Sequence, residues 1–313
     1  MRPSVGRCAA FPAPASSGRR ASGCLSAAAR RTVPRTIPGT NVPEDLRQII
    51  HQRSHGTAAA GFIQVDGRAR LKTLRQEGSA KAILPHVGGT VPEVVFLNTS
   101  GGLASGDRLC YRLDLGPDVR AVATTQTAER AYRATGAPAE VAAEFRIGAG
   151  GWLDWLPQET ILFDGAGLKR QTRIELGAGA GCLLLETVIL GRAAMGETVA
   201  RVVLDDLRHI AREGRPVFVE PLRLEDATLR RGAAVLGGAR ALASLVLVAG
   251  GAEDRLGPVR AVAAEPGVDW AASAFAGKLV VRAMAQDGFR LRRQVVRLLG
   301  ALRDGPLPRV WQN

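Results

Sequence analysis

The sequence predicts a mainly β protein, and three observations support that fold class. Apolar and polar residues alternate in several short segments, as in Leu109–Leu115. A half-buried strand needs this alternation, because successive side chains point to opposite faces of a sheet. Breaks rich in glycine and proline, such as Gly116-Pro117, Gly148–Gly151 and Gly177–Gly181, separate the alternating segments. Helical periodicity is confined to a few segments in the C-terminal half.

Further strands are predicted along the chain by the same alternation. In Leu168–Leu176, the residues Leu168, Ile174 and Leu176 share one face with Arg170 and Thr172. Leu242–Val248 is short and rich in branched apolar residues, which predicts a fully buried strand. The remaining alternating segments are Val119–Thr127, Val141–Ile147, Val217–Leu224 and Lys278–Ala285. Short strands joined by turns lead us to expect mainly antiparallel pairing.

Helices are expected in two places. Phe289–Arg303 repeats leucine and valine at three- and four-residue spacings and ends before Gly305-Pro306, which predicts an amphipathic helix. Thr228–Leu236 is a weaker candidate, because Gly232 interrupts it. Val202–His209 is compatible with a helix start or with a strand.

The N-terminal segment differs in composition from the rest of the chain. Residues 1–45 are rich in Pro, Ala, Ser and Arg and lack hydrophobic periodicity, so we expect an extension without packed structure. Its composition fits an organellar transit peptide and an upstream mis-assigned start codon equally well. Residues 46–313 are then predicted to form a single domain.

The positive charge of the chain is concentrated in this extension. The formal net charge is +13, and residues 1–43 contribute seven arginines and no acid. The rest of the chain has neither a dense basic helix nor an interleaved aromatic platform, so a nucleic-acid-binding module is the weakest functional alternative. No apolar run approaches the roughly 20 residues that a membrane-spanning helix requires.

A glycine-rich loop, Asn98–Asp107, is the first candidate for function. Gly101 and Gly106 have the spacing of a phosphate-binding loop, but Asp107 occupies the position of the phosphate-binding lysine. A carboxylate there would repel a phosphate, so we expect that the chain does not bind or hydrolyse a nucleotide.

Two further segments contain acids among apolar residues. Glu159 with Asp164 or Asp154 could form the carboxylate pair of a β-rich hydrolase. Alternatively, Asp164 forms a turn with Gly165. Glu186 interrupts a run of large aliphatic residues, and a buried carboxylate needs a partner such as Arg192 or a metal ion.

Taken in order, seven short motifs resemble those of the UreD family of urease accessory proteins, called UreH in some organisms. Each motif is weak alone, whereas their order and spacing are specific. The resemblance extends from about residue 57 to the C-terminus. The motifs are Lys81–Pro85, Gly101–Asp107, Thr124-Thr125-Gln126 followed by Tyr132-Arg133, Trp155–Thr160, Phe163-Asp164-Gly165, Leu190-Gly191-Arg192 with Gly196-Glu197, and Leu307–Trp311. Ser105 departs from the pattern, because the family often has glycine at that position.

The resemblance implies a two-layered, β-helix-like array of many short strands with about two helices towards the C-terminus. It implies a non-catalytic, cytoplasmic chaperone that binds the helical protein UreF and, through it, the GTPase UreG. This complex would dock on apo-urease and assist nickel insertion. It further implies strands around Val202–His209.

The family's proposed nickel passage corresponds here to Asp107, Glu159 and Glu197, with Thr124 and Thr125 nearby. Isolated carboxylates and hydroxyls suit a cation in transit, because a His/Cys cage would retain a late first-row metal. The four histidines and four cysteines form no HExxH or C-x-x-C pair, which agrees with this expectation. No tightly bound cofactor is expected.

Overall fold

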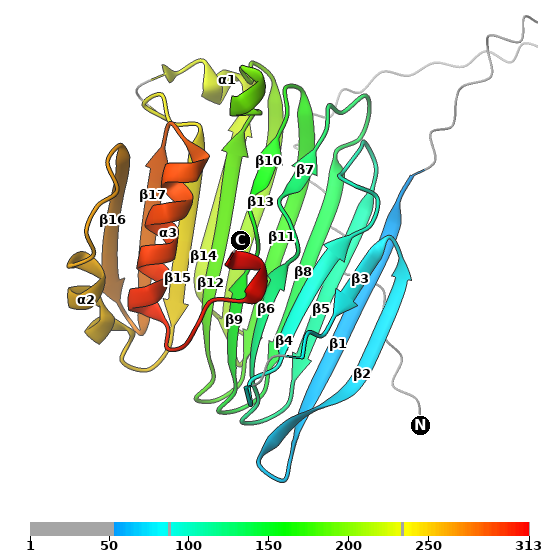
Figure 1. Cartoon of the computed structure of the whole chain (residues 1–313), viewed down its shortest axis with the longest axis vertical. Helices are drawn as coiled ribbons and strands as arrows, with labels where there is room; N and C mark the ends of the chain where they lie inside the picture. The colour runs from blue at the N-terminus through cyan, green and yellow to red at the C-terminus, as the bar shows by residue number, and fades with distance from the viewer. Residues whose placement is uncertain (1–52, 87–88, 233–234, 313) are drawn as a thin grey trace, which may run out of the picture. The chain divides into compact units, whose positions relative to one another are not determined.

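Two β-sheets form the framework of the protein (Figure 1). The computed structural model describes residues 53–86, 89–232 and 235–312. Sheet A has seven strands, in the order β14-β13-β11-β8-β5-β1-β2. Sheet B has ten strands: β16-β17-β15-β12-β9-β6-β4-β3, with β10 paired to β12 and β7 paired to β10. The predicted mainly β fold is confirmed, as is the two-layered, β-helix-like arrangement that the resemblance implies.

The predicted N-terminal extension, residues 1–45, lies outside the described residues. Residues 53–313 belong to one compact unit. The predicted domain boundary at residue 46 therefore stays a prediction.

The strands are short to medium in length. Sheet A comprises β1 (His55–Val65), β2 (Arg68–Gly78), β5 (Arg108–Leu115), β8 (Ala139–Ile147), β11 (Ala166–Leu176), β13 (Val202–Arg212) and β14 (Arg215–Glu225). Sheet B comprises β3 (Ala80–Ile83), β4 (Glu93–Asn98), β6 (Arg120–Thr125), β7 (Glu129–Ala131), β9 (Trp152–Leu156), β10 (Thr160–Leu162), β12 (Gly181–Leu190), β15 (Ala241–Val248), β16 (Val268–Phe275) and β17 (Lys278–Ala285).

Between β4 and β13 the chain alternates between the sheets, so successive turns of a coil stack on one another. Within sheet A, β5, β8, β11 and β13 pair in parallel, and within sheet B, β4, β6, β9 and β12 do the same. The expectation of mainly antiparallel pairing is wrong for this region. The alternation of apolar and polar residues shows only which face of a strand is buried, not the direction of its neighbours. Parallel strands are usually joined by a helical crossover, whereas here a strand of the opposite sheet makes that connection.

The two ends of the coils differ. At one end, short turns at residues 116–119, 148–151 and 177–180 lead from sheet A to sheet B; these turns lie at the bottom of Figure 1. At the other end, four longer connections return to sheet A: residues 99–107, 126–138, 157–165 and 191–201. We call these four connections the long arcs. They contain most of the motifs singled out from the sequence.

Three α-helices occur among the described residues: α1 (Asp226–Leu229), α2 (Leu256–Arg260) and α3 (Gly288–Leu302). α3 confirms the predicted helix, and the Asp287 carboxylate caps it by accepting hydrogen bonds from the backbone N–H groups of Phe289 and Arg290. The second candidate is reduced to the four-residue α1, and Gly232 adopts a positive φ of 55°. Three short 3₁₀ helices are η2 (Ala193–Met195), η4 (Ala252–Arg255) and η5 (Arg309–Trp311).

Two hydrophobic cores hold these layers together. The larger core fills the space between the sheets, and its aromatic centre is Trp155, whose ring lies 4.8 Å from Phe145 and 6.2 Å from Phe96. The second core lies between sheet B and α3 and includes Leu291, Val295, Leu298, Leu299 and Leu302. Each fully buried leucine contributes about 2 kcal/mol of transfer free energy. None of the described helices has the length and apolarity to span a bilayer.

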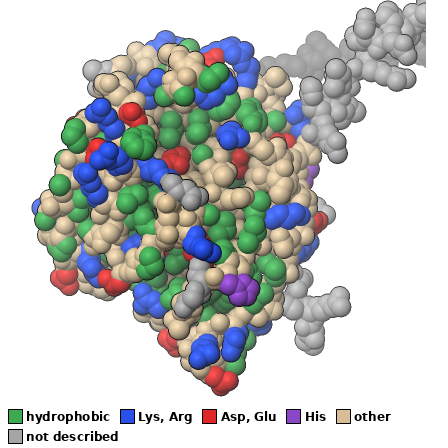
Figure 2. All heavy atoms as spheres, viewed as in Figure 1, with side chains coloured by type: hydrophobic (Ala, Val, Ile, Leu, Met, Phe, Trp, Pro, Cys, Tyr) green, Lys and Arg blue, Asp and Glu red, His purple; other side chains and the backbone are tan. Residues whose placement is uncertain are grey.

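The edges of sheet A are β2 and β14. β2 is mostly exposed and carries Arg68, Arg70, Lys72 and Arg75. β14 carries Pro216 and Pro221. On the face drawn in Figure 2, basic side chains are interspersed with acidic and apolar ones.

Candidate functional site

The long arcs stack on one another through a continuous series of contacts. The hydroxyl of Tyr132, in the second arc, donates a hydrogen bond to the carbonyl of Gly101 in the first (2.8 Å). Gly102 lies so close to the Tyr132 ring that a Cβ atom would be 2.4 Å from it. The Tyr132 ring meets Phe163 of the third arc edge to face at 5.2 Å, and the Arg192 guanidinium lies 4.3 Å from the Phe163 ring. Motifs distant in sequence therefore form one surface.

The Asp107 carboxylate stabilises the glycine-rich loop through hydrogen bonds to backbone N–H groups. Its two carboxylate oxygens accept hydrogen bonds from the backbone N–H groups of Ser54 and Ala104, both at 2.8 Å, and the residue is 4% exposed. The buried Ser105 hydroxyl accepts hydrogen bonds from the backbone N–H groups of Thr135 (2.7 Å) and Gly136 (3.3 Å). The serine that departs from the family pattern thus links the first arc to the second.

Glu197 organises the fourth arc. Its carboxylate accepts hydrogen bonds from the Nε and backbone N–H of Arg192 (2.8 and 3.0 Å) and from the backbone N–H of Asp164 (3.1 Å). The Arg192 hydrogen bond is the main cause that lowers the pKa of Glu197 to about 2. The negative charge of Glu197 is therefore present throughout the physiological pH range.

Asp164 forms the predicted turn with Gly165, which has a φ of +78°. Its carboxylate accepts hydrogen bonds from the backbone N–H groups of Ala200 and Arg201, both at 3.0 Å, and these bonds lower its pKa. It also forms an ion pair with Arg133 at 3.2 Å. Asp164 therefore fastens the third arc to the fourth.

Glu159 and Thr124 lie close to Trp311, in the C-terminal motif Leu307–Trp311. Glu159 forms an ion pair of 2.8 Å with Arg292 of α3, and the Arg292 guanidinium stacks over the Trp311 ring at 4.3 Å. The buried Thr124 hydroxyl donates to the Leu156 carbonyl at 2.6 Å, and the indole N–H of Trp311 donates to the same carbonyl at 3.0 Å. The structure thus connects the C-terminus to the ends of β6 and β9.

Two small, partly open cavities lie beside the long arcs. Their volumes are about 70 and 50 Å³, enough for a few water molecules each, because one water needs roughly 10–15 Å³. Tyr111, Thr125 and Glu129 line both cavities. Of the five residues predicted for nickel passage, Thr125 lines them directly. Glu159 is next to them in sequence, between the lining residues Gln158 and Thr160.

Glu129 was not predicted as a site residue. Its carboxylate accepts a hydrogen bond from the Arg130 backbone N–H (3.2 Å) and a long one from the Asn98 amide (3.5 Å). Burial raises its pKa to about 7, and the nearby charge of Asp107 adds to the rise. The only signal in the sequence was an acid between two motifs, Thr124-Thr125-Gln126 and Tyr132-Arg133.

Glu186 has a different partner from the predicted Arg192. Its carboxylate forms an ion pair with Arg170 (2.7 Å) and accepts hydrogen bonds from Thr172 (2.8 Å) and the Trp155 indole (3.2 Å). Arg192 pairs with Glu197 instead. Arg170 and Thr172 follow the predicted alternation, which places both in the core.

The resulting series of alternating charges runs Glu186, Arg170, Asp206, Arg208, Glu220 and Arg282.

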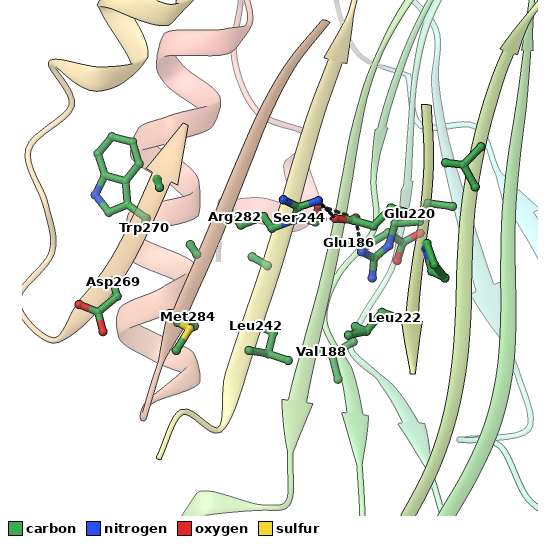
Figure 3. Close-up of a pocket in the computed structure, with 16 residues that line it drawn as sticks. Glu186, Val188, Glu220, Leu222, Leu242, Ser244, Asp269, Trp270, Arg282 and Met284 are labelled. Carbon is green, nitrogen blue, oxygen red and sulfur yellow. Dashed lines mark hydrogen bonds and ion pairs between the residues drawn. The ribbon is translucent and has the colours of Figure 1, made fainter. Parts of the chain in front are cut away.

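This charged series leads into a groove of about 600 Å³ at the far edge of the sheets. Sheet B extends beyond β14 through β17 and β16, so the groove lies where sheet A ends (Figure 3). Val188, Leu222, Leu242 and Met284 give it an apolar lining. Glu220 accepts hydrogen bonds from Ser244 and Arg282 at its polar end.

The carboxylates considered for a hydrolase are held by separate arginines. Glu159 pairs with Arg292, whereas Asp154 pairs with Arg303 at 3.0 Å. Asp164 pairs with Arg133 and fastens two arcs. The described residues also contain no cluster of three or more His, Cys, Asp or Glu side chains suited to hold a metal ion.

Comparison with known proteins identifies similar sequences over the same region. A family model described as "UreD urease accessory protein" matches residues 54–312. A protein of Cereibacter sphaeroides named "Urease accessory protein UreD" is 63% identical over 264 residues, which cover 84% of this chain and 96% of the relative. Proteins with the same name from Paracoccus denitrificans and Rhizobium leguminosarum bv. trifolii are 56% and 43% identical, each over 83% of this chain and over 93% and 96% of their own length.

Proposed function

Because the chain belongs to the UreD family of urease accessory proteins, with a role in urease maturation, we propose that it acts as a nickel-loading chaperone. In this role it forms a complex with UreF and the GTPase UreG in the cytoplasm. The complex docks on apo-urease and assists insertion of nickel into the urease active site. The observation that carries the proposal is the family match across residues 54–312.

The glycine-rich loop supports a division of labour in which GTP hydrolysis belongs to the partner. The Asp107 carboxylate is fixed inside this loop by two backbone N–H groups, at the position where a phosphate-binding loop has lysine. Each of the three acids Glu159, Asp154 and Asp164 forms an ion pair with a different arginine. This favours a structural role for them over the catalytic role that a hydrolase would need. A non-catalytic accessory role therefore fits the geometry best.

We further propose that nickel is cargo that passes through the chain beside Asp107, Glu159 and Glu197, with Thr124 and Thr125 nearby. The small cavities lined by Thr125 support this route, because each has space for a few water molecules. Oxygen ligands bind a late first-row cation less tightly than imidazole or thiolate does, so a cation would not be retained. No tightly bound cofactor is required.

Urease activation tests the proposed function. Apo-urease is expressed with UreF and UreG, with or without this chain, and urease activity, urease nickel content and co-purification of the partners are measured. We expect nickel loading and activity to depend on the chain. Full activation without the chain, or hydrolytic turnover by the isolated chain, would refute the chaperone assignment.

Two substitutions test the route separately from assembly. Glu197→Ala and Asp107→Asn should lower urease nickel content while UreF and UreG still co-purify with the chain. Asparagine keeps the size of Asp107 and removes its charge. Unchanged nickel loading by both variants would refute the passage beside these acids and leave the accessory role intact.

A further inference from the structure

Glu129 occupies a distinctive position among the carboxylates of the core. Together with Tyr111 and Thr125 it lines both small cavities, so it lies between them. One cavity is lined by arc residues such as Gly101 and Thr127, and the other reaches the core residues Thr160 and Thr172. A particle moving between the two spaces would pass Glu129.

The other carboxylate that lines these cavities is already neutralised. Glu186 is bound by the Arg170 guanidinium at 2.7 Å and accepts hydrogen bonds from Thr172 and Trp155. The positive charge of Arg170 would also repel a cation from that end. Glu186 is therefore a poor ligand for a cation, and the Arg170–Glu186 pair sets the inner limit of any cation path.

Glu129 differs from Glu186 in its partners. In the described part of the chain, its carboxylate has no ion pair within 4.0 Å. The two hydrogen bonds that it accepts both go to Oε1, from neutral amides at 3.2 and 3.5 Å. A half-buried carboxylate with so few donors is able to bind a positively charged ligand.

Some neighbouring side chains carry neutral oxygen atoms. Thr125 and Tyr111 line both cavities beside Glu129. The outer cavity is also lined by Asn98, Thr127 and Arg130. One anionic oxygen ligand with neutral oxygens and space for water is the chemistry of a weak divalent-cation site.

We propose that Glu129 is the carboxylate that binds the divalent cation in transit, at the position where it lines both small cavities together with Tyr111 and Thr125. This inference rests on the proposed nickel-loading function and adds a residue to the passage. The cation would retain part of its water shell there, because the cavities have space for water. Among the described residues that line them, Glu129 supplies the one carboxylate without an ion pair.

Direct metal binding and urease activation test the proposal together. The untagged full chain is titrated with nickel chloride alone by calorimetry, as wild type, Glu129→Gln and Glu129→Asp. Glu129→Gln keeps the shape and removes the charge, so we expect at least a tenfold loss of nickel affinity. We also expect a severalfold loss of nickel in urease, with UreF and UreG still bound. Glu129→Asp keeps the charge and should retain most of both.

The matched control is Glu77→Gln, which makes the same chemical change at an exposed position on β2. It should match wild type in both assays. If Glu129→Gln also matches wild type while Glu197→Ala fails to load urease, the Glu129 assignment is wrong and the proposed function stands. If urease is loaded fully without the chain, the proposed function itself is wrong.

Discussion

Replacing Glu129 with glutamine should make the protein more stable at alkaline pH. Burial raises the pKa of Glu129 from 4.5 to about 7 in the folded state. Each tenfold change in proton affinity corresponds to about 1.4 kcal/mol, so ionised Glu129 lowers the free energy of unfolding by about 3 kcal/mol relative to its protonated form.

The sign of the effect follows from proton binding. Between pH 4.5 and 7 the folded state binds the Glu129 proton and the unfolded state does not, so raising the pH favours unfolding. The stabilising contribution of protonated Glu129 is complete below pH 4.5 and is lost as the pH rises through 7. Glutamine at this position does not titrate and keeps its contribution.

Urea unfolding at pH 5 and pH 8 measures this effect. Relative to wild type, Glu129→Gln should gain about 2–3 kcal/mol more at pH 8 than at pH 5. Comparing the two proteins at each pH cancels the titration of all other groups, and Glu77→Gln should show no such difference. An equal difference in unfolding free energy at both pH values would refute the argument that Glu129 is desolvated.

Three other perturbations have defined outcomes. Arg170→Ala leaves buried carboxylates without their partner and should lower the urea-unfolding free energy by about 3–5 kcal/mol; a loss below about 1 kcal/mol would contradict the ion-pair series. Leu298→Ala, in the fully buried face of α3, should cost about 2–5 kcal/mol, whereas Phe289→Ala, 68% exposed on the same helix, should stay within about 0.5 kcal/mol. Gly102→Ala would bring its Cβ to 2.4 Å from a tyrosine ring and should lower the melting temperature more than Gly101→Ala, which has no atom within 4 Å; equal losses would show that only backbone strain matters.

The sequence predicted individual strands well, because alternation is a local property. β5, β11 and β17 appear close to their predicted bounds, and the predicted position of Arg170 on the core face of β11 is confirmed. Alternation does not reveal the direction of neighbouring strands. The parallel stacking of coils, and with it the pairing of Arg170 with Glu186 and Asp206, depends on contacts between residues that are far apart in sequence.

The site was predicted only in part for the same reason. The motifs that suggested the family do converge in the long arcs, where Asp107, Glu159 and Glu197 each hold a segment in place. Glu129 carried no local signal, because its burial depends on β4, β5 and the second arc meeting around it. Whether nickel passes beside these acids stays a prediction for the experiments above.

The two edges of sheet A also bear on assembly. A stack of parallel coils is open-ended, because the last strand presents unpaired backbone groups that could template another chain. Here the strand at one end carries Pro216 and Pro221, which have no N–H to donate, and the strand at the other end carries four basic residues that would repel a second copy. Both edge strands of sheet A therefore carry residues that disfavour pairing with a strand of another copy.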